Sequence, residues 1–321
     1  MGKKEIYPIV LGIFILGLMR GPALGSEPIR IGYLQSDIHQ LACWVALEKG
    51  FYKKQGVDVK LAGIFRAGPE EMSAFAAGAL DMGYVGEAPA TTAVANGMAR
   101  VRILAQVNTE GSAIVVREKA NIKTMNDLRG KRVAVPGHST VQDFLLRKAM
   151  AKWNIPMNEI NITVLKPPEM INALRTKQID AFIAWEPYPA KAQTMGVGRV
   201  LLYSRDIWKN HPCCVLVADQ RFLASRPAEA RRMVAAHVEA TDFIDNNPEE
   251  AGRIAVKYTG MDPESVRLAM QNVNYTYQLS IEGEKEYVRF LVGLKYIHVK
   301  DIDAFTRNFI CQDILKELVK K

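Results

Sequence analysis

Cysteine is scarce in this sequence of 321 residues, which contains only four. So few cysteines in a chain of this length exclude a disulfide framework. Cys213 and Cys214 are adjacent, so a bridge between them would be strained, and Cys43 falls on an apolar helix face. No Cys-x-x-Cys pair occurs and no histidine stands at ligand spacing, so the sequence predicts neither zinc nor another metal or cofactor. Buried free thiols are the expected state.

The usual signatures of enzymes are also missing. There is no Walker loop, no Gly-x-Gly-x-x-Gly after a strand, no His-Glu-x-x-His and no Gly-x-Ser-x-Gly elbow. His138 stands beside Ser139, but neighbouring residues rarely face each other as base and nucleophile. The sequence therefore predicts a protein without catalytic residues.

Charge of one sign is not concentrated anywhere along the chain. Lysine and arginine exceed the acidic residues by eight, but they are spread out and not interleaved with aromatic residues. Nucleic acid is therefore not an expected partner, and a solvated surface explains the excess. No low-complexity block occurs, and 49% hydrophobic with 24% charged residues is ordinary for a globular protein, so we expect no disordered domain.

A long apolar run is present only near the N-terminus. Two lysines precede apolar residues 9–18, and small residues follow, which is the pattern of a secretory signal peptide. Residues 1–25 are therefore predicted to be a signal peptide, cleaved near Gly25-Ser26, and the mature protein is expected in the periplasm. The run is shorter than the roughly 20 apolar residues that a bilayer span needs, and a retained N-terminal anchor is the alternative.

One short sequence motif, called the doubled phrase below, occurs twice in the rest of the sequence. Asp81 and Glu87 in LDMGYVGEAP match Asp180 and Glu186 in IDAFIAWEPYP at the same offset. Both copies follow a helix-like stretch, and proline stands close behind each glutamate. Two such matches in register predict two similar lobes, each ending a strand at a comparable place.

Strand-like and helix-like segments alternate around these phrases. In the first half, strands are predicted at 29–35, 57–65, 81–86 and 102–107, with helices at 41–56, 69–79 and 90–98. The order restarts with strands at 131–136, 160–167 and 179–185, and from about residue 221 the chain is predicted to be mainly helical. Repeated β-α-β-α-β units imply an α/β fold with mostly parallel sheets covered by helices on both faces.

Several polar residues stand at strand ends, where open α/β sheets bind ligands. Ser139 or Thr140 would cap the following helix and leave backbone N–H groups for an anion, although ordinary capping with nothing bound is the alternative. Trp185 could form an aromatic wall, and Tyr188 could donate its hydroxyl or pack in the core. Arg66 could pair with an anionic group or be solvated.

The two glutamates of the doubled phrase leave a choice open. Glu186 could accept from a ligand amine, or it could hold its own loop by accepting local backbone N–H groups, which is the favoured reading; Glu87 faces the same choice. If either carboxylate faces the ligand, a zwitterion such as taurine is favoured over nitrate. A buried carboxylate beside an unpaired anion would be costly.

Three stretches of the sequence resemble a known family. FRAGPEEMSAFAAGALDMGYVGEAPATTAVANG, MNDLRGKRVAVPGHST and IDAFIAWEPY are similar to solute-binding proteins of ABC importers for alkanesulfonates, taurine, nitrate and thiamine-pyrimidine precursors. The aliphatic-sulfonate branch is most similar, through AGP, GALD and GEAP, and the likeness runs from about Ile29 to Asp219.

The resemblance implies a two-lobed periplasmic-binding-protein fold of the second type. Lobe 1 would comprise residues 27–113 and 217–321, and lobe 2 residues 114–216. Crossovers near Ser112-Ala113 and Cys214-Val215 would form the hinge. The ligand would lie between the lobes. The residues implied to bind it are Gln35, Ser36, Glu87, Ala88, His138, Ser139, Thr140, Trp185, Glu186 and Tyr188, and Arg66 and Ser112 complete the predicted set.

The chain departs from the sulfonate binders at two of these positions. Such proteins tend to have a run of small hydroxyl residues where His138 stands, and they often have aspartate at the position of Glu186. His138 would narrow the pocket or add a hydrogen-bond donor.

The expected function is that of a monomeric, exported receptor. It would close over a small anionic or zwitterionic solute and deliver it to an ABC permease and ATPase in the membrane. One alternative is an enzyme of the same fold acting on a pyrimidine or tetrapyrrole precursor, but pyrimidine synthases look cysteine-rich where this chain has only Cys213-Cys214. Another is the effector lobe of a transcription regulator, which would need an N-terminal helix-turn-helix.

Overall fold

The computed structural model describes residues 1–2 and 27–319. The predicted signal peptide and its cleavage point therefore lie outside the described residues. In the described part of the chain, no helix has both the length and the apolar character needed to cross a membrane.

The first sheet has six strands in the order β11-β4-β10-β3-β1-β2. Three of the four strands predicted in the first half of the chain are its parallel strands: β1 (Ile29–Leu34), β2 (Val59–Phe65) and β3 (Met82–Gly86). Its antiparallel strands are β4 (Val101–Glu110), β10 (Pro212–Asp219) and β11 (Val273–Tyr275). The late strand β10 thus sits between two strands from the beginning of the chain.

The second sheet has five strands in the order β7-β6-β8-β5-β9. The predicted strands are again the parallel ones: β6 (Arg132–Val135), β7 (Asn161–Val164) and β8 (Ala181–Trp185). Two antiparallel strands complete it: β5 (Ser112–Arg117) and β9 (Gly198–Tyr203). Both sheets are therefore mixed, where the sequence predicts mostly parallel ones.

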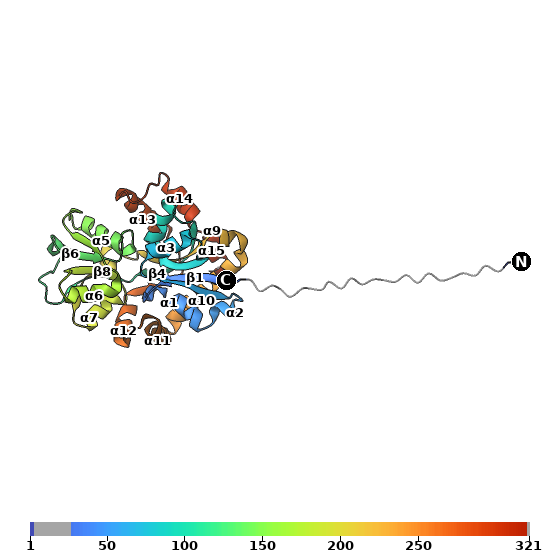
Figure 1. Ribbon diagram of the computed structural model, residues 1–321, viewed down its shortest axis with the longest axis horizontal. Coiled ribbons are helices and arrows are strands. Elements are labelled where there is room, and N and C mark those ends of the chain that lie inside the picture. The colour runs from blue at the N-terminus through green and yellow to red at the C-terminus, as the bar shows by residue number, and fades with distance from the viewer. Residues whose placement is uncertain (3–26, 320–321) are drawn as a thin grey trace.

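Helices pack around both sheets, which lie side by side in Figure 1. Those beside the first sheet are α1 (Leu41–Glu48), α2 (Phe51–Lys54), α3 (Gly68–Ala76), α4 (Glu87–Ala95), α9 (Gln220–Ser225), α10 (Pro227–Asn246), α11 (Pro248–Thr259), α12 (Pro263–Met270), α13 (Ile281–Gly293), α14 (Ile302–Phe309) and α15 (Asp313–Val319). Those beside the second are α5 (Val141–Lys152), α6 (Pro167–Arg175), α7 (Tyr188–Thr194) and α8 (Ser204–Ile207). Short 3₁₀ helices occur at Ile38–Gln40 and Met125–Leu128.

One predicted helix is interrupted. The stretch 41–56 forms α1 and α2, which are separated at Gly50, a residue with a φ of 70°. This left-handed conformation suits glycine, because it lacks a Cβ atom. Apolar residues continue across the break, so the sequence pattern alone predicts one helix.

The chain passes between the sheets twice. The first passage is at Gly111, between β4 and β5, and the second lies between β9 and β10. Cys214 and Val215, where the sequence predicts the second crossover, lie inside β10 of the first sheet. The exact lobe boundaries stay a prediction.

The largest hydrophobic cluster contains residues from both sheets and their helices. In it, the ring of Phe144 on α5 lies 4.4 Å from that of Tyr287 on α13 and 4.7 Å from that of Phe290. Aromatic contacts at such distances add to the free energy gained by burying apolar surface. The two halves of the molecule are therefore packed against each other, with the site between them.

Candidate functional site

A small cavity lies between the two sheets, at the carboxyl ends of β1, β3 and β8 and beside the start of α5. Its volume is about 10 Å³, which is room for about one water molecule in this arrangement of the lobes. The residues that line it are Leu34, Asp37, Gly68, Gly86, Pro89, Cys213 and Cys214 on the side of the first sheet, and Thr140, Val141, Gln142 and Trp185 on the side of the second. The topology places it where open α/β sheets bind ligands.

Thr140 caps α5 at the edge of this cavity. Its Oγ1 accepts a hydrogen bond of 3.2 Å from the Asp143 N–H, as a helix N-cap does. The N–H groups of Val141 and Gln142 have no acceptor within the helix, because the first turn lacks preceding carbonyls. Both residues border the cavity, so the N-terminus of α5 presents donors and the positive end of its dipole there.

Trp185 closes the cavity at the end of β8. Its side chain is buried, and within the described chain its indole Nε1 has no hydrogen-bond partner. The Tyr188 ring packs edge-on against it, with the ring centroids 6.3 Å apart. A buried N–H without a partner is uncommon in proteins, so a bound acceptor at this position would stabilise it.

Neither glutamate of the doubled phrase lines this cavity. The carboxylate of Glu186 accepts hydrogen bonds from the Ala190 N–H at 3.0 Å and from Asn272 Nδ2 at 2.8 Å. Burial raises the pKa of Glu186 to about 7, although these two donors act in the opposite direction. The side chain holds its own loop and connects it to the end of α12.

Glu87 lies in the first turn of α4 and is buried. Its Oε2 accepts from Gln106 Nε2 at 3.1 Å, and burial raises its pKa to about 7. Burial and then the charge of Glu87 raise the pKa of the neighbouring Glu284 well above its usual range. The two carboxyl groups form a buried pair inside the first lobe. Ala88, the next residue, is also buried.

Ser112 lies directly behind the lining of the cavity. Its hydroxyl accepts a hydrogen bond of 2.9 Å from Gln142 Nε2, and its N–H donates to Ser204 Oγ at 3.3 Å. Ser112 therefore orients a side chain that lines the cavity, on the first segment that passes between the sheets.

The remaining predicted residues lie farther out. Gln35, Ser36 and Tyr188 line a second, wider groove near α6 and α11. Arg66 is exposed and forms an ion pair with Glu169 of α6. His138 is exposed and Ser139 is half-buried, and the Ser139 N–H donates to the carboxylate of Asp143 at 3.1 Å. The structure thus brings Thr140 and Trp185 together at the cavity, and none of this outer group lines it.

Sequence reasoning missed Asp37, His39, Cys213, Cys214 and Gln142. Asp37 and the two cysteines line the cavity, and His39 is buried beside them. His39 and Cys213 are 174 residues apart, so no spacing rule connects them. The one available signal was the position of Asp37 and His39, directly after the loop that follows β1.

This chain is similar in sequence to a known protein family. Residues 23–258 match the NMT1-like family. A Brucella abortus protein named as a binding protein is 30% identical over 248 residues, which cover 76% of each chain. The chain belongs to the NMT1-like family. The predicted relationship to this group of binding proteins is thereby confirmed.

One further relative and one solved structure are similar to this NMT1-like protein over most of their length. A Bacillus subtilis protein named for binding aliphatic sulfonates is 27% identical over 330 residues, covering 98% of each chain. The crystal structure of the periplasmic nitrate-binding protein NrtA from Synechocystis superposes with a TM-score of 0.79 at 18% identity, covering 91% of this chain and 88% of the other. The predicted two-lobed α/β fold is confirmed, and relatives named as binding proteins favour binding over an enzyme.

Proposed function

We propose that this NMT1-like protein is the exported solute-binding component of an ABC importer. It holds a small anionic or zwitterionic solute between its lobes, with a sulfonate favoured, and delivers it to the membrane permease and ATPase. The names of its relatives support this class of function. The protein acts as a monomer in the periplasm, without catalysis, and the predicted signal peptide directs its export.

The observation that carries the proposal is the unpartnered donor of Trp185 beside the N-terminus of α5. The indole N–H and the first-turn N–H groups belong to residues that line one cavity. Oxygen atoms of a sulfonate or nitrate accept several hydrogen bonds at once, and they favour the positive end of a helix dipole. An apolar solute would leave these buried donors without partners.

The carboxylates near the cavity bear on the charge of the solute. Glu87 and Glu186 do not line the cavity, so they do not argue for a zwitterion. Asp37 is the one carboxylate among the described residues that line the cavity. An ammonium group, as in taurine, would have Asp37 as its partner. Nitrate has no ammonium group, so it would bind only to the N–H donors of Trp185 and of the first turn of α5.

Closure of the lobes follows from the position of these groups. Trp185 and α5 belong to the second sheet, and Asp37 follows β1 of the first. A solute that contacts both sides stabilises the closed arrangement over an open one, in which it could contact only one side. Because the cavity is narrow, the lobes must part for a solute to enter or leave.

The test is a thermal-shift and calorimetric screen of residues 26–321 with taurine, short alkanesulfonates, nitrate and pyrimidines. A saturable rise in melting temperature with one anion class is expected. Trp185→Phe keeps the aromatic ring and removes the N–H. It should weaken binding of that anion about tenfold, as the loss of a hydrogen bond to a charged group does.

Trp153→Phe is the matched control, because Trp153 is half-buried at the far end of α5. It should leave the affinity unchanged. Equal affinities in Trp185→Phe and the wild type, or binding of pyrimidines and no anion, would contradict the proposal.

A further inference from the structure

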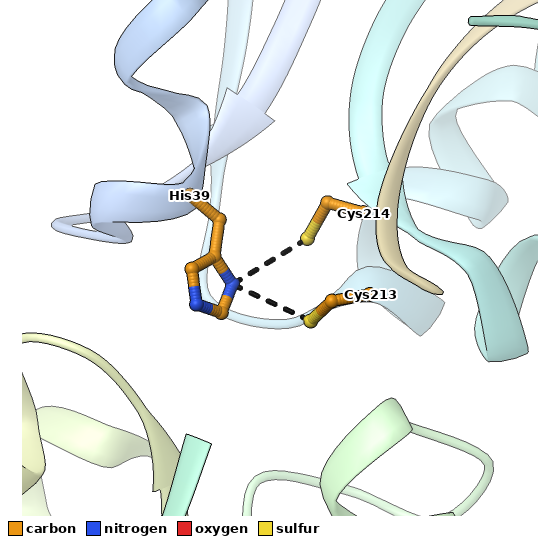
Figure 2. Close-up of side chains that lie close together, drawn as sticks. All are labelled: His39, Cys213 and Cys214. Carbon is orange, nitrogen blue, oxygen red and sulfur yellow. Dashed lines mark hydrogen bonds between the residues drawn. The ribbon is translucent and has the colours of Figure 1, made fainter. Parts of the chain in front are cut away.

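Three potential metal ligands meet at the floor of the cavity. His39 Nδ1 lies 3.5 Å from Cys213 Sγ and 3.7 Å from Cys214 Sγ, and the ligand atoms all lie within 4.8 Å of one another. Figure 2 shows the imidazole nitrogen directed at both sulfur atoms. All three residues are buried, with at most 3% of Cys214 exposed. Thiolate and imidazole are the ligands that soft and borderline metal ions prefer.

A distortion of β10 brings the two sulfur atoms to one side. Successive residues of a regular strand point to opposite faces, so adjacent cysteines would normally diverge. Here the pairing of β10 with β4 shifts between Pro212 and Cys214 and again between Cys214 and Val215, and Cys213 has no partner on β4. Bulges of this kind redirect side chains and are frequent beside functional sites.

The imidazole is oriented as metal ligands usually are. His39 Nε2 lies 2.8 Å from the carbonyl oxygen of Gly111 and donates its proton there, while Nδ1 faces the two sulfur atoms. Histidines that bind metals commonly donate their second ring N–H to a backbone carbonyl. Gly111 has a φ of 85°, and a Cβ atom at this position would collide with the His39 ring. Only glycine allows this close approach.

The two nitrogen–sulfur distances agree with a tetrahedral site. Bond lengths of about 2.0–2.1 Å to nitrogen and about 2.3 Å to sulfur separate the two ligand atoms by about 3.6 Å in a tetrahedron. The two Nδ1–Sγ distances lie on either side of this value.

We propose that His39, Cys213 and Cys214 bind a zinc-like divalent cation at the floor of the cavity. Binding forms one metal–nitrogen and two metal–sulfur bonds and releases to solvent the two thiol protons, together with the Nδ1 proton of an imidazole protonated beside Asp37. The two resulting thiolates balance the charge of the cation, which a buried site requires.

Three protein ligands leave a fourth position for water or solute, as in open zinc sites. Both cysteines line the cavity, so this position faces it. Asp37, whose Oδ1 lies 3.3 Å from His39 Nδ1, is the neighbouring acceptor. Its carboxylate already accepts from the His39 N–H and from Gln40 Nε2, both at 3.0 Å. The inference goes beyond the proposed function, because the three ligands meet without any solute.

The test measures zinc binding by the mature chain, purified without chelator and kept reduced with a phosphine. Equilibrium dialysis should give close to one zinc ion per chain. Substitution with Co²⁺ should produce the intense near-ultraviolet band of a thiolate–cobalt bond. Cys213→Ser and Cys214→Ser should each weaken zinc binding by at least about 100-fold and abolish that band.

Cys311→Ser is the matched control, because Cys311 is a free and only partly buried thiol outside the cluster. It should bind zinc like the wild type. Thermal melts confirm that each variant folds, and His39→Gln provides a second variant if a cysteine variant does not fold. Unchanged zinc affinity in the Cys213 and Cys214 variants, or a Cys213–Cys214 disulfide that resists the phosphine, would overturn the inference.

Anion binding is measured on the same samples with and without zinc, which separates this inference from the proposed function. Zinc binding without any anion response would support the metal site and contradict the proposed function. Anion binding by a wild-type protein that takes up no zinc would support the proposed function and contradict the metal site.

Discussion

At the scale of single residues, burial decides the protonation of several carboxyl groups. Glu87 and Glu284 lie together between α4 and α13, and both are buried. Thr91 Oγ1 donates to the Glu284 carboxyl at 2.9 Å, and Gln106 donates to Glu87. Two neighbouring carboxylates cannot both ionise cheaply in such surroundings, so the folded state retains a proton.

This pair predicts that stability falls as pH rises. The folded-state pKa of Glu87 is about 7, above the unfolded value of 4.5. Between these values the folded state binds more protons than the unfolded state, so the free energy of unfolding decreases with increasing pH. Glu87→Gln keeps an acceptor for Gln106 and removes the titration. The variant should therefore gain stability relative to the wild type between about pH 5 and pH 8, measured by urea unfolding.

Glu118→Gln is the control for this measurement, because Glu118 is exposed. It should show no such gain. A difference between Glu87→Gln and the wild type that stays constant across this pH range would show that the pair does not retain its proton.

The predicted residues of the cavity and the missed ones differ in a physical respect. Trp185 ends β8 and Thr140 caps α5 after the loop that follows β6, and the rule for α/β sheets locates such positions from sequence. Cys213 faces His39 because a bulge alters the register of β10, and bulges leave no reliable pattern in a single sequence. The side-chain partners of Glu87 and Glu186 could not be predicted, since they come from distant segments.

At the scale of elements, the strands also divide into those that follow a regular sequence pattern and those that do not. Parallel strands connected by helices produce the alternating pattern that predicted β1–β3 and β6–β8. Of the antiparallel strands, β4 was predicted at 102–107, whereas β5, β9, β10 and β11 escaped prediction. All residues of β10 are buried, so it lacks the two-residue alternation of a half-exposed strand.

A side-chain hydrogen bond connects the end of α12 to the loop after β8, and its contribution to stability can be tested. Asn272 follows α12 and donates to the buried Glu186 carboxylate at 2.8 Å. Asn272→Ala leaves that carboxylate with one donor fewer, so it should destabilise the protein by roughly 1–3 kcal/mol in urea unfolding. Asn274→Ala, at an exposed position of β11, is the control and should have a much smaller effect. Equal losses in the two variants would show that the contact with Glu186 contributes little.

At the scale of the whole molecule, the lobes are connected on both sides of the cavity. Lys148 on α5 pairs with Glu286 on α13 at 2.6 Å, close to the aromatic contact of Phe144. On the other side, Lys191 on α7 pairs with Asp262 before α12 at 2.8 Å, and Lys166 pairs with Glu70 of α3 at 2.8 Å. These side chains are partly exposed, and each such pair contributes only about 0–1 kcal/mol.

Weak pairs of this kind bias the equilibrium between closed and open lobes without fixing it. The double variant Lys166→Ala/Lys191→Ala should therefore shift the solute-free protein toward the open form, seen as a larger radius of gyration in X-ray scattering. Binding of the screened anion should weaken by up to about tenfold, because part of its binding energy is then used to close the lobes. Arg129→Ala, which breaks an ion pair with Glu159 within the second lobe, should change neither quantity. If the double variant scatters like the wild type and binds equally well, contacts deeper in the interface, such as those of Phe144 and Glu186, determine closure.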